Sequence, residues 1–271
     1  KSRECWRRSC RQTAERADYA SVEQFILKKL SIVIPVYNEA PTVRKLIERV
    51  LCVDLGDVGR EVIVVNDGST DQSREVLEAI EKERPQLVKV CHHEENRGKG
   101  AAVRTALEHV TGDVVIIQDA DLEYDPQDVP KLLVPFEDRS VSVVYGSRNL
   151  RKNPRSSWSF YWGGRLVSWV ANLLYGSDLT DEATGYKLIR TELLRSLGLC
   201  SEGFEFCPEV TGKLLRRGVK IHEIPISYDP RGLDEGKKIA WRDGLVAIWT
   251  LVRHRFAYDP KEEINDPERG E

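Results

Sequence analysis

The sequence predicts an α/β protein with a doubly wound, mostly parallel sheet and helices on both of its faces. Three observations support this fold class. Apolar segments of strand length recur along the chain, segments with helical spacing of apolar residues separate them, and polar clusters rich in Asp, Asn and Gly follow the strands. Strands and helices that alternate in this rhythm build parallel sheets that are covered on both faces.

The first half of the chain supplies four strands separated by three helices. The predicted strands cover residues 30–34, 61–65, 87–91 and 114–117. The first helix starts at Pro41 and Thr42, and its apolar residues have helical spacing: Val43, Leu46, Ile47 and Val50. The second helix passes through Val76, Leu77 and Ile80, and the third covers 101–110. These units predict the parallel core of the sheet.

The second half of the chain is less regular. Its predicted elements are a strand over 141–145, an aromatic-rich helix over 158–175, a helix that opens near 204, a strand over 219–228 and an amphipathic helix over 241–256. Two interpretations of 158–175 stay open, because its apolar residues leave little polar face. It is either a core helix packed over the sheet or an interfacial helix whose aromatic residues enter a membrane surface.

These elements predict one main domain between two terminal segments. We expect residues 1–28 to form a flexible N-terminal extension, residues 29–240 the main domain, and residues 241–271 an amphipathic helix with a polar tail. The charged N-terminal residues have no apolar core and no cleavage-site pattern, so no signal peptide is predicted.

Composition narrows the class of protein. The 271 residues are 41% hydrophobic and 31% charged, as in globular domains. The net charge of −3 offers no basic excess for a nucleic-acid partner. Six scattered cysteines fit a reduced compartment, and no apolar run approaches the roughly 20 residues that span a bilayer. We therefore expect a cytoplasmic protein that is peripheral at the cytoplasmic face of a membrane if it works there.

Two aspartates after the strand 114–117 are the centre of the predicted site. Asp119 and Asp121 follow this strand directly, and the carboxyl ends of parallel strands border the crevice where open sheets bind ligands. Carboxylates so close together repel each other unless a cation neutralises them, and a hard divalent cation also holds phosphate oxygens. A D-x-D pattern alone is more typical of a polar turn that ends a strand than of a binding site.

Three more polar clusters follow strands, and together they favour a binding site over a simple polar turn. They are Y-N-E, N-D-G-S-T-D and N-R-G-K-G, at 37–39, 66–71 and 96–100. Tyr37 suits stacking on a base, Asp67 or Asp71 suits ribose hydroxyls or a base edge, and Lys99 or Arg97 supplies positive charge. No Walker A motif or dinucleotide fingerprint is present. Four clusters at one sheet edge predict a nucleotide site.

The same clusters resemble a known family. P-V-Y-N-E, N-D-G-S-T-D, N-R-G-K-G and D-A-D-L, in this order, resemble the motifs of family 2 glycosyltransferases of the GT-A fold, over roughly residues 30–256. Within this family, the chain is most similar to the dolichol-phosphate mannose synthase group, because it also contains G-S-R, T-G-Y-K and P-I-S-Y-D-P-R followed by E-G-K-K. The resemblance implies metal-dependent transfer of a hexose from a GDP- or UDP-sugar to a polyprenyl phosphate, with Mg²⁺ or Mn²⁺ as cofactor. In-line attack would invert the anomeric configuration.

The resemblance and the residue types together assign roles. The predicted donor-binding residues are Pro35, Tyr37, Glu39, Asp67, Lys99, Asp119, Ala120, Asp121, Arg231 and Lys237. Asp121 and Glu123 are the implied metal ligands, and Asp121 and Arg148 the predicted catalytic residues. Arg148, Arg165 and Ser168 would hold the acceptor phosphate. Arg165 is included because the second arginine of the group falls on Gly164 here. The group also commonly has Gln at Glu123 and Asp at Asn66.

Several interpretations stay open. Asp181 either backs the acceptor site or is a turn residue, and Glu205 or Glu209 either faces the site or caps a helix start. His92 and His93 are predicted to be ordinary loop residues. A family 2 enzyme acting on a saccharide or small hydroxyl acceptor would need a base such as Asp181 or Glu205. A third possibility is an inactive nucleotide-sugar binding module. A separate membrane-anchoring partner is a further expectation.

Overall fold

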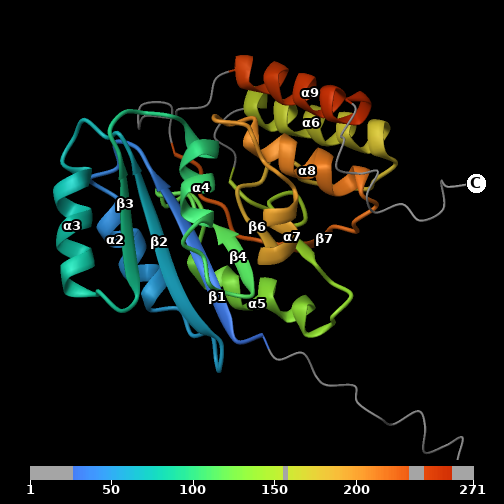
Figure 1. The fold of residues 1–271 in the computed structure, drawn as a ribbon. Coiled ribbons are helices and arrows are strands. Elements are labelled where there is room, and N and C mark those ends of the chain that lie inside the picture. Colours follow the sequence, from blue (N-terminus) through green and yellow to red (C-terminus); the bar gives the residue numbers. More distant parts are fainter. Residues whose placement is uncertain (1–26, 155–157, 232–240, 258–271) are drawn as a thin grey trace, which may run out of the picture.

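The computed structural model describes residues 27–154, 158–231 and 241–257, and in these the chain forms a seven-stranded sheet (Figure 1). The strand order is β3-β2-β1-β4-β6-β5-β7. The strands are β1 Lys29–Val36, β2 Gly59–Asp67, β3 Val88–His93, β4 Val114–Ile117, β5 Val143–Ser147, β6 Lys187–Arg190 and β7 His222–Pro225. β1 to β4 run parallel, β6 is antiparallel to both β4 and β5, and β7 is parallel to β5.

Helices cover both faces of the sheet, as predicted. α2 Val43–Leu51, α3 Ser73–Glu83 and α5 Val129–Leu133 pack on the face formed by side chains such as Ile32 and Val64. α4 Lys99–Leu107, α7 Thr191–Ser196 and α8 Phe206–Arg216 pack on the opposite face, against side chains such as Val33 and Val65. The alternation arises because successive strand residues point to opposite faces. Two short 3₁₀ turns, Pro126–Asp128 and Val134–Glu137, flank α5.

Two further helices lie outside this sandwich. α6 Trp158–Tyr175 and α9 Trp241–Phe256 run side by side over α8 (Figure 1). Val167, Ala171 and Leu251 form a small apolar cluster between α6 and α9. Neither alternative for 158–175 describes this fully: α6 buries one stripe against α8 and α9 and exposes Trp158, Trp162 and Trp169.

The structure differs from the sequence-based expectations at three places. Residues 187–190 form an antiparallel strand that was not predicted, because four residues give too short a pattern. The predicted strand 219–228 is shorter, covering only His222–Pro225. The prediction that His92 and His93 are loop residues is wrong: both lie in β3, paired with Asn66 and Asp67 of β2.

Candidate active site

One large pocket lies at the carboxyl edge of the parallel strands and extends to the outer helices. Its volume is about 1730 Å³. Pockets for one small ligand are usually about 300–1,000 Å³, so this space can admit two ligands together. Most predicted site residues line it, together with Asn153, Tyr228 and several glycines.

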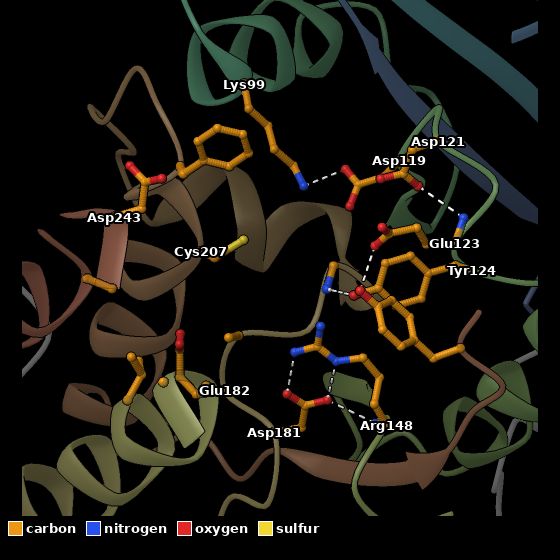
Figure 2. Close-up of a pocket in the computed structure, with 18 of the residues that line it drawn as sticks. Lys99, Asp119, Asp121, Glu123, Tyr124, Arg148, Asp181, Glu182, Cys207 and Asp243 are labelled. Carbon is orange, nitrogen blue, oxygen red and sulfur yellow. Dashed lines mark hydrogen bonds and ion pairs between the residues drawn. The ribbon is translucent and has the colours of Figure 1, made fainter. Parts of the chain in front are cut away.

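Asp119, Asp121 and Glu123 lie near one another after the end of β4 (Figure 2). Burial, together with the charges of Asp119 and Glu123, raises the pKa of Asp121 to about 7. The backbone N–H of Glu123 donates to Asp121 Oδ1 at 3.1 Å, which fixes the turn after the strand. Leu122 has a positive φ of 65° at this turn. A protein that keeps such mutually repelling carboxylates in a pocket is suited to a cation there.

The other two carboxylates already have protein partners. Lys99 Nζ lies 2.5 Å from Asp119 Oδ1, and the pKa of Lys99 is raised because this carboxylate outweighs the effect of burial. Tyr228 Oη donates to Glu123 Oε2 at 2.6 Å. The described residues contain no cluster of three metal-ligating side chains. Asp121 and Glu123 therefore fit a metal that takes its other ligands from diphosphate oxygens and water, as Mg²⁺ commonly does.

Arg231 links three parts of the chain across the pocket. Its Nη2 is 2.8 Å from Glu39 Oε2, its Nε donates to the carbonyl oxygen of Asp121 at 2.8 Å, and its backbone N–H donates to Glu123 Oε1 at 3.0 Å. Glu39 is 6% exposed. Pro35, Tyr37 and Ala120 line the same part of the pocket. The structure thus brings Arg231 to the predicted diphosphate region, whereas Lys237 lies outside the described residues.

Asp67 has a well-defined structural task. Its Oδ1 accepts from the backbone N–H of Arg97 at 3.0 Å, and its Oδ2 accepts from that of Gly98 at 2.7 Å. His93 Nδ1 lies 2.7 Å from Asp67 Oδ1, and its Nε2 lies 2.8 Å from Thr105 Oγ1. Asp67 lines the pocket, but it also holds the turn that starts α4. Its contact with a nucleotide stays a prediction.

Arg148 is fixed on the other side of the pocket by Asp181. Arg148 Nε is 2.7 Å from Asp181 Oδ2, and Nη2 is 2.7 Å from Oδ1. The Arg148 backbone N–H also donates to Asp181 Oδ2 at 2.9 Å. The ion pair raises the pKa of Arg148 despite its burial. Glu223 accepts from the backbone N–H groups of Thr180 and Asp181, at 2.7 and 2.9 Å, and so holds the loop beneath.

The two other predicted acceptor residues lie near Arg148 but differ from each other. Arg165 is exposed, lines the pocket and donates from Nη1 to the carbonyl oxygen of Thr180 at 3.2 Å. Ser168 is 2% exposed. Its hydroxyl donates to the Gly164 carbonyl oxygen at 3.0 Å and accepts from the Glu182 N–H at 2.9 Å. The first hydrogen bond lies within α6, and the second holds α6 to the 180–185 loop. Its contact with the acceptor stays a prediction.

Glu205 and Glu209, whose roles the sequence left undecided, both accept hydrogen bonds from the backbone near the start of α8. Glu205 directly precedes α8 and accepts from the backbone N–H of Gly203 at 3.0 Å, so its side chain holds the turn before the helix and does not cap α8. Glu209 is fully buried and accepts from the N–H groups of Cys200 and Ser201. Burial opposes ionisation of Glu209, but Lys213 and these N–H groups lower its pKa to about 2. Neither glutamate lines the pocket.

The sequence did not reveal an aromatic cluster behind the site. Tyr124 stacks on Tyr186 with ring centroids 4.7 Å apart, and Tyr228 lies 5.4 Å from Tyr124. Tyr124 Oη accepts from the Gly185 N–H at 2.8 Å, and the Arg148 guanidinium lies 5.1 Å above the Tyr228 ring. These rings come from three distant segments. Only Tyr124, close to the D-A-D motif, offered a local signal.

A GT-A type sheet with an acidic D-x-D loop and a basic opposite wall defines a glycosyltransferase. The chain belongs to the family described as Glycosyl transferase family 2, whose model matches residues 31–198. This confirms the fold class, the family and the enzyme class predicted above. Among the described residues, no helix has both the length and the apolarity to cross a membrane.

Known proteins of two kinds are similar to this chain. The undecaprenyl-phosphate 4-deoxy-4-formamido-L-arabinose transferase of Edwardsiella ictaluri is 30% identical over 211 residues, which are 77% of this chain and 62% of that relative. Glucosyl-3-phosphoglycerate synthase of Mycobacterium tuberculosis, solved with UDP, superposes with a TM-score of 0.64 at 22% identity. That match covers 86% of this chain and 82% of the synthase. The same synthase has been solved with Mg²⁺ and UDP, with a TM-score of 0.64 and 22% identity over 86% of this chain and 81% of its own.

Proposed function

We propose that the protein transfers a sugar, with inversion, from a nucleotide-diphosphate donor to a polyprenyl phosphate, and that the transfer depends on Mg²⁺ or Mn²⁺. The observation that carries the proposal is that one pocket has an acidic wall and, opposite it, a basic wall. Acidic residues at the end of β4 suit a metal–diphosphate, while Arg148 and Arg165 on the far wall suit an anionic acceptor. The sugar-lipid transferase of Edwardsiella ictaluri supports a polyprenyl phosphate as acceptor.

On the donor side, Asp121 and Glu123 would hold the metal, which when bound would neutralise the departing diphosphate. Arg231 donates to the Asp121 carbonyl oxygen, and Lys99 pairs with the neighbouring Asp119. Each is already paired with a carboxylate, Glu39 or Asp119, so each is held in place before the donor arrives. Preorganised positive charge of this kind stabilises developing negative charge without a reorganisation cost.

On the acceptor side, the chain needs a cation more than a base. A phosphate monoester has a second pKa near 6, so at neutral pH it is already a nucleophilic dianion. Arg148 can orient it because Asp181 fixes the guanidinium through two side-chain contacts. Both Asp181 carboxylate oxygens already accept from Arg148, so neither is free to take a proton from a hydroxyl acceptor.

A transfer assay tests the proposal. The protein is incubated with labelled GDP- and UDP-sugars, Mg²⁺ or Mn²⁺, and undecaprenyl or dolichyl phosphate, and labelled lipid is measured. The donors include hexoses, which stay a prediction, and an arabinose derivative, because that is the sugar named for the relative. No labelled lipid with any donor would reject the proposal. Transfer to a saccharide instead would favour the hydroxyl-acceptor alternative, and nucleotide binding without turnover would favour the inactive module.

A further inference from the structure

A buried histidine lies behind the donor side of the pocket, and the proposed reaction does not use it. His93 is the last residue of β3, and its side chain is 7% exposed. Its Nδ1 lies 2.7 Å from Oδ1 of Asp67, the last residue of β2, and its Nε2 lies 2.8 Å from Oγ1 of Thr105 on α4. Both ring nitrogens therefore have a protein partner, and the ring joins two strands to a helix.

The order of these groups, carboxylate, imidazole and hydroxyl, is that of a nucleophilic triad, but their position rules this role out. A hydroxyl nucleophile has to reach its substrate, and neither His93 nor Thr105 lines the pocket. Asp67 does line it. An ionised carboxylate can only accept hydrogen bonds, so Nδ1 of His93 donates to Asp67. His93 can therefore act on a bound ligand only through Asp67.

The Asp67 carboxylate is almost fully occupied by donors from the protein. Besides His93, the backbone N–H groups of Arg97 and Gly98 donate to it, at 3.0 and 2.7 Å. An ionised carboxylate has about four acceptor positions, so these donors leave about one for a ligand. The Asp67 side chain is 4% exposed. The main task of Asp67 is therefore to hold the turn formed by residues 96–98.

This turn places a cation of the donor side. Gly98 directly precedes α4, whose first residue is Lys99. Because the Gly98 N–H is fastened to Asp67, the carboxylate fixes where α4 begins and thus where the Lys99 side chain starts. Figure 2 shows this side chain extending to Asp119, and its Nζ lies 2.5 Å from Oδ1 of that aspartate. A continuous set of hydrogen bonds leads from His93 to the residue beside Lys99.

We propose that His93 is a positioning residue of the donor site: it orients the Asp67 carboxylate so that the turn before α4 holds the Lys99 ammonium beside the donor diphosphate. The task of Lys99 toward a diphosphate rests on the proposed function, whereas the hold on the turn does not. Without the His93 contact, Asp67 is free to rotate away from the two N–H groups. The start of α4 then moves more freely, and an ammonium that is not held in place binds a diphosphate less tightly.

Two substitutions separate the two ring nitrogens. His93→Asn keeps an N–H donor near the position of Nδ1, so it retains the contact with Asp67 and loses the contact with Thr105. His93→Gln places its amide near the position of Nε2 and loses the contact with Asp67. His92→Gln is the matched control, because His92 precedes His93 on β3 and its Nδ1 lies 3.2 Å from Nδ2 of Asn66 instead.

Amide hydrogen exchange of the ligand-free full chain tests the hold on the turn. The Arg97 and Gly98 N–H groups should exchange about tenfold faster in His93→Gln, since a hydrogen bond to a charged group is worth about that factor or more. His93→Asn and His92→Gln should leave both rates within about twofold of the wild type. Unchanged exchange in His93→Gln, or equal acceleration in His92→Gln, would overturn the proposal. If His93→Gln does not fold, wild-type exchange in His93→Asn still supports the proposal and acceleration there overturns it.

Nucleotide affinity shows what the turn does for the donor. With Mg²⁺ present, the Kd of His93→Gln for UDP or GDP should rise about tenfold, while the Kd for the matching nucleoside stays within about twofold. The reason is that only the diphosphate carries the charge that Lys99 meets. An equal loss of nucleoside affinity would overturn the proposal, because Asp67 would then bind the base or ribose itself. No binding of either diphosphate by the wild type would reject the proposed function, and the exchange rates would still decide whether His93 holds the turn.

Discussion

The ion pair between Arg148 and Asp181 offers the sharpest test of how the acceptor side is built. Asp181 is 1% exposed and the Arg148 side chain 22%, and two side-chain contacts of 2.7 Å join them. The perturbation is a double-mutant cycle with Arg148→Ala, Asp181→Ala and the double variant. The hydrogen bond from the Arg148 backbone N–H to Asp181 survives in Arg148→Ala, so the cycle isolates the side-chain pair.

The burial of the pair sets the expected magnitude. At an effective dielectric constant of about 20, unit charges about 4 Å apart attract by about 4 kcal/mol. Removing one partner of a buried pair typically costs about 3–5 kcal/mol, because the other charge stays buried without compensation. We therefore expect Asp181→Ala to lower the free energy of unfolding by about 3 kcal/mol or more. The coupling energy of the pair should be about 2–3 kcal/mol.

Urea unfolding measures these free energies, and a second pair in the chain is the control. Arg49 Nη2 lies 2.9 Å from Asp125 Oδ1, but both side chains are exposed, at 36% and 37%. Its coupling energy should be about 0–1 kcal/mol. Coupling between Arg148 and Asp181 that is no larger than this would refute the reasoning. In the assay, Asp181→Ala should raise the acceptor KM while the affinity for nucleotide stays unchanged.

Three further predictions concern the donor side and the fold. Gly98 has a φ of +92°, and a Cβ atom there would lie 2.4 Å from the Glu202 carbonyl oxygen. Gly98→Ala should therefore lower the free energy of unfolding, measured with urea, far more than the control Gly56→Ala does. At Gly56 the φ is +59°, but an added Cβ atom would meet nothing within 4 Å. Burial would raise the pKa of Glu61, but hydrogen bonds from a lysine, a serine and a threonine lower it from 4.5 to about 2. The ionised Glu61 side chain therefore stabilises the fold fully above pH 4.5, and this stabilisation is lost as the pH falls toward 2. In urea unfolding, Glu61→Gln should lower the free energy of unfolding by about 2 kcal/mol at pH 7 and by almost nothing near pH 2. Asp121 has a pKa raised from 3.8 to about 7, so its ionisation destabilises the metal-free fold increasingly between those pH values. At pH 8, Asp121→Asn should raise the free energy of unfolding by about 2 kcal/mol or more, which a higher melting temperature would report. The same variant should abolish sugar transfer and the thermal shift caused by Mn²⁺.

The sequence predicted the parallel half of the fold well because that half is built from local patterns. Strands β1, β2 and β4 each contain an apolar run and lead into a polar cluster, and parallel pairing brings these clusters to one edge of the sheet. The family motifs lie in those clusters, so the donor side could be predicted together with the fold. Asp119, Asp121 and Lys99 indeed lie together in one pocket.

The acceptor side depends on contacts that no local pattern shows. β6 has only four residues, and it places the 180–186 loop beneath Arg148. Asp181 was open between two interpretations because its partner is 33 residues away. The prediction that His93 is a loop residue failed for the same reason, because its contact with Asp67 spans 26 residues of sequence. Tertiary pairing therefore decided what the sequence left open.

The position of β6 in the sheet has a consequence for how the chain folds. β5 precedes β6 by about 40 residues in synthesis, yet in the sheet β6 lies between β4 and β5. β1 to β4 can assemble first, because β1, β2 and β3 find all their partners within this set and β4 pairs with β1. Until β6 arrives, the free edge of β4 and both edges of β5 lack their partners, and such edges invite association between chains. Fragments that end between residues 147 and 187 should therefore aggregate, whereas the full chain closes this edge itself.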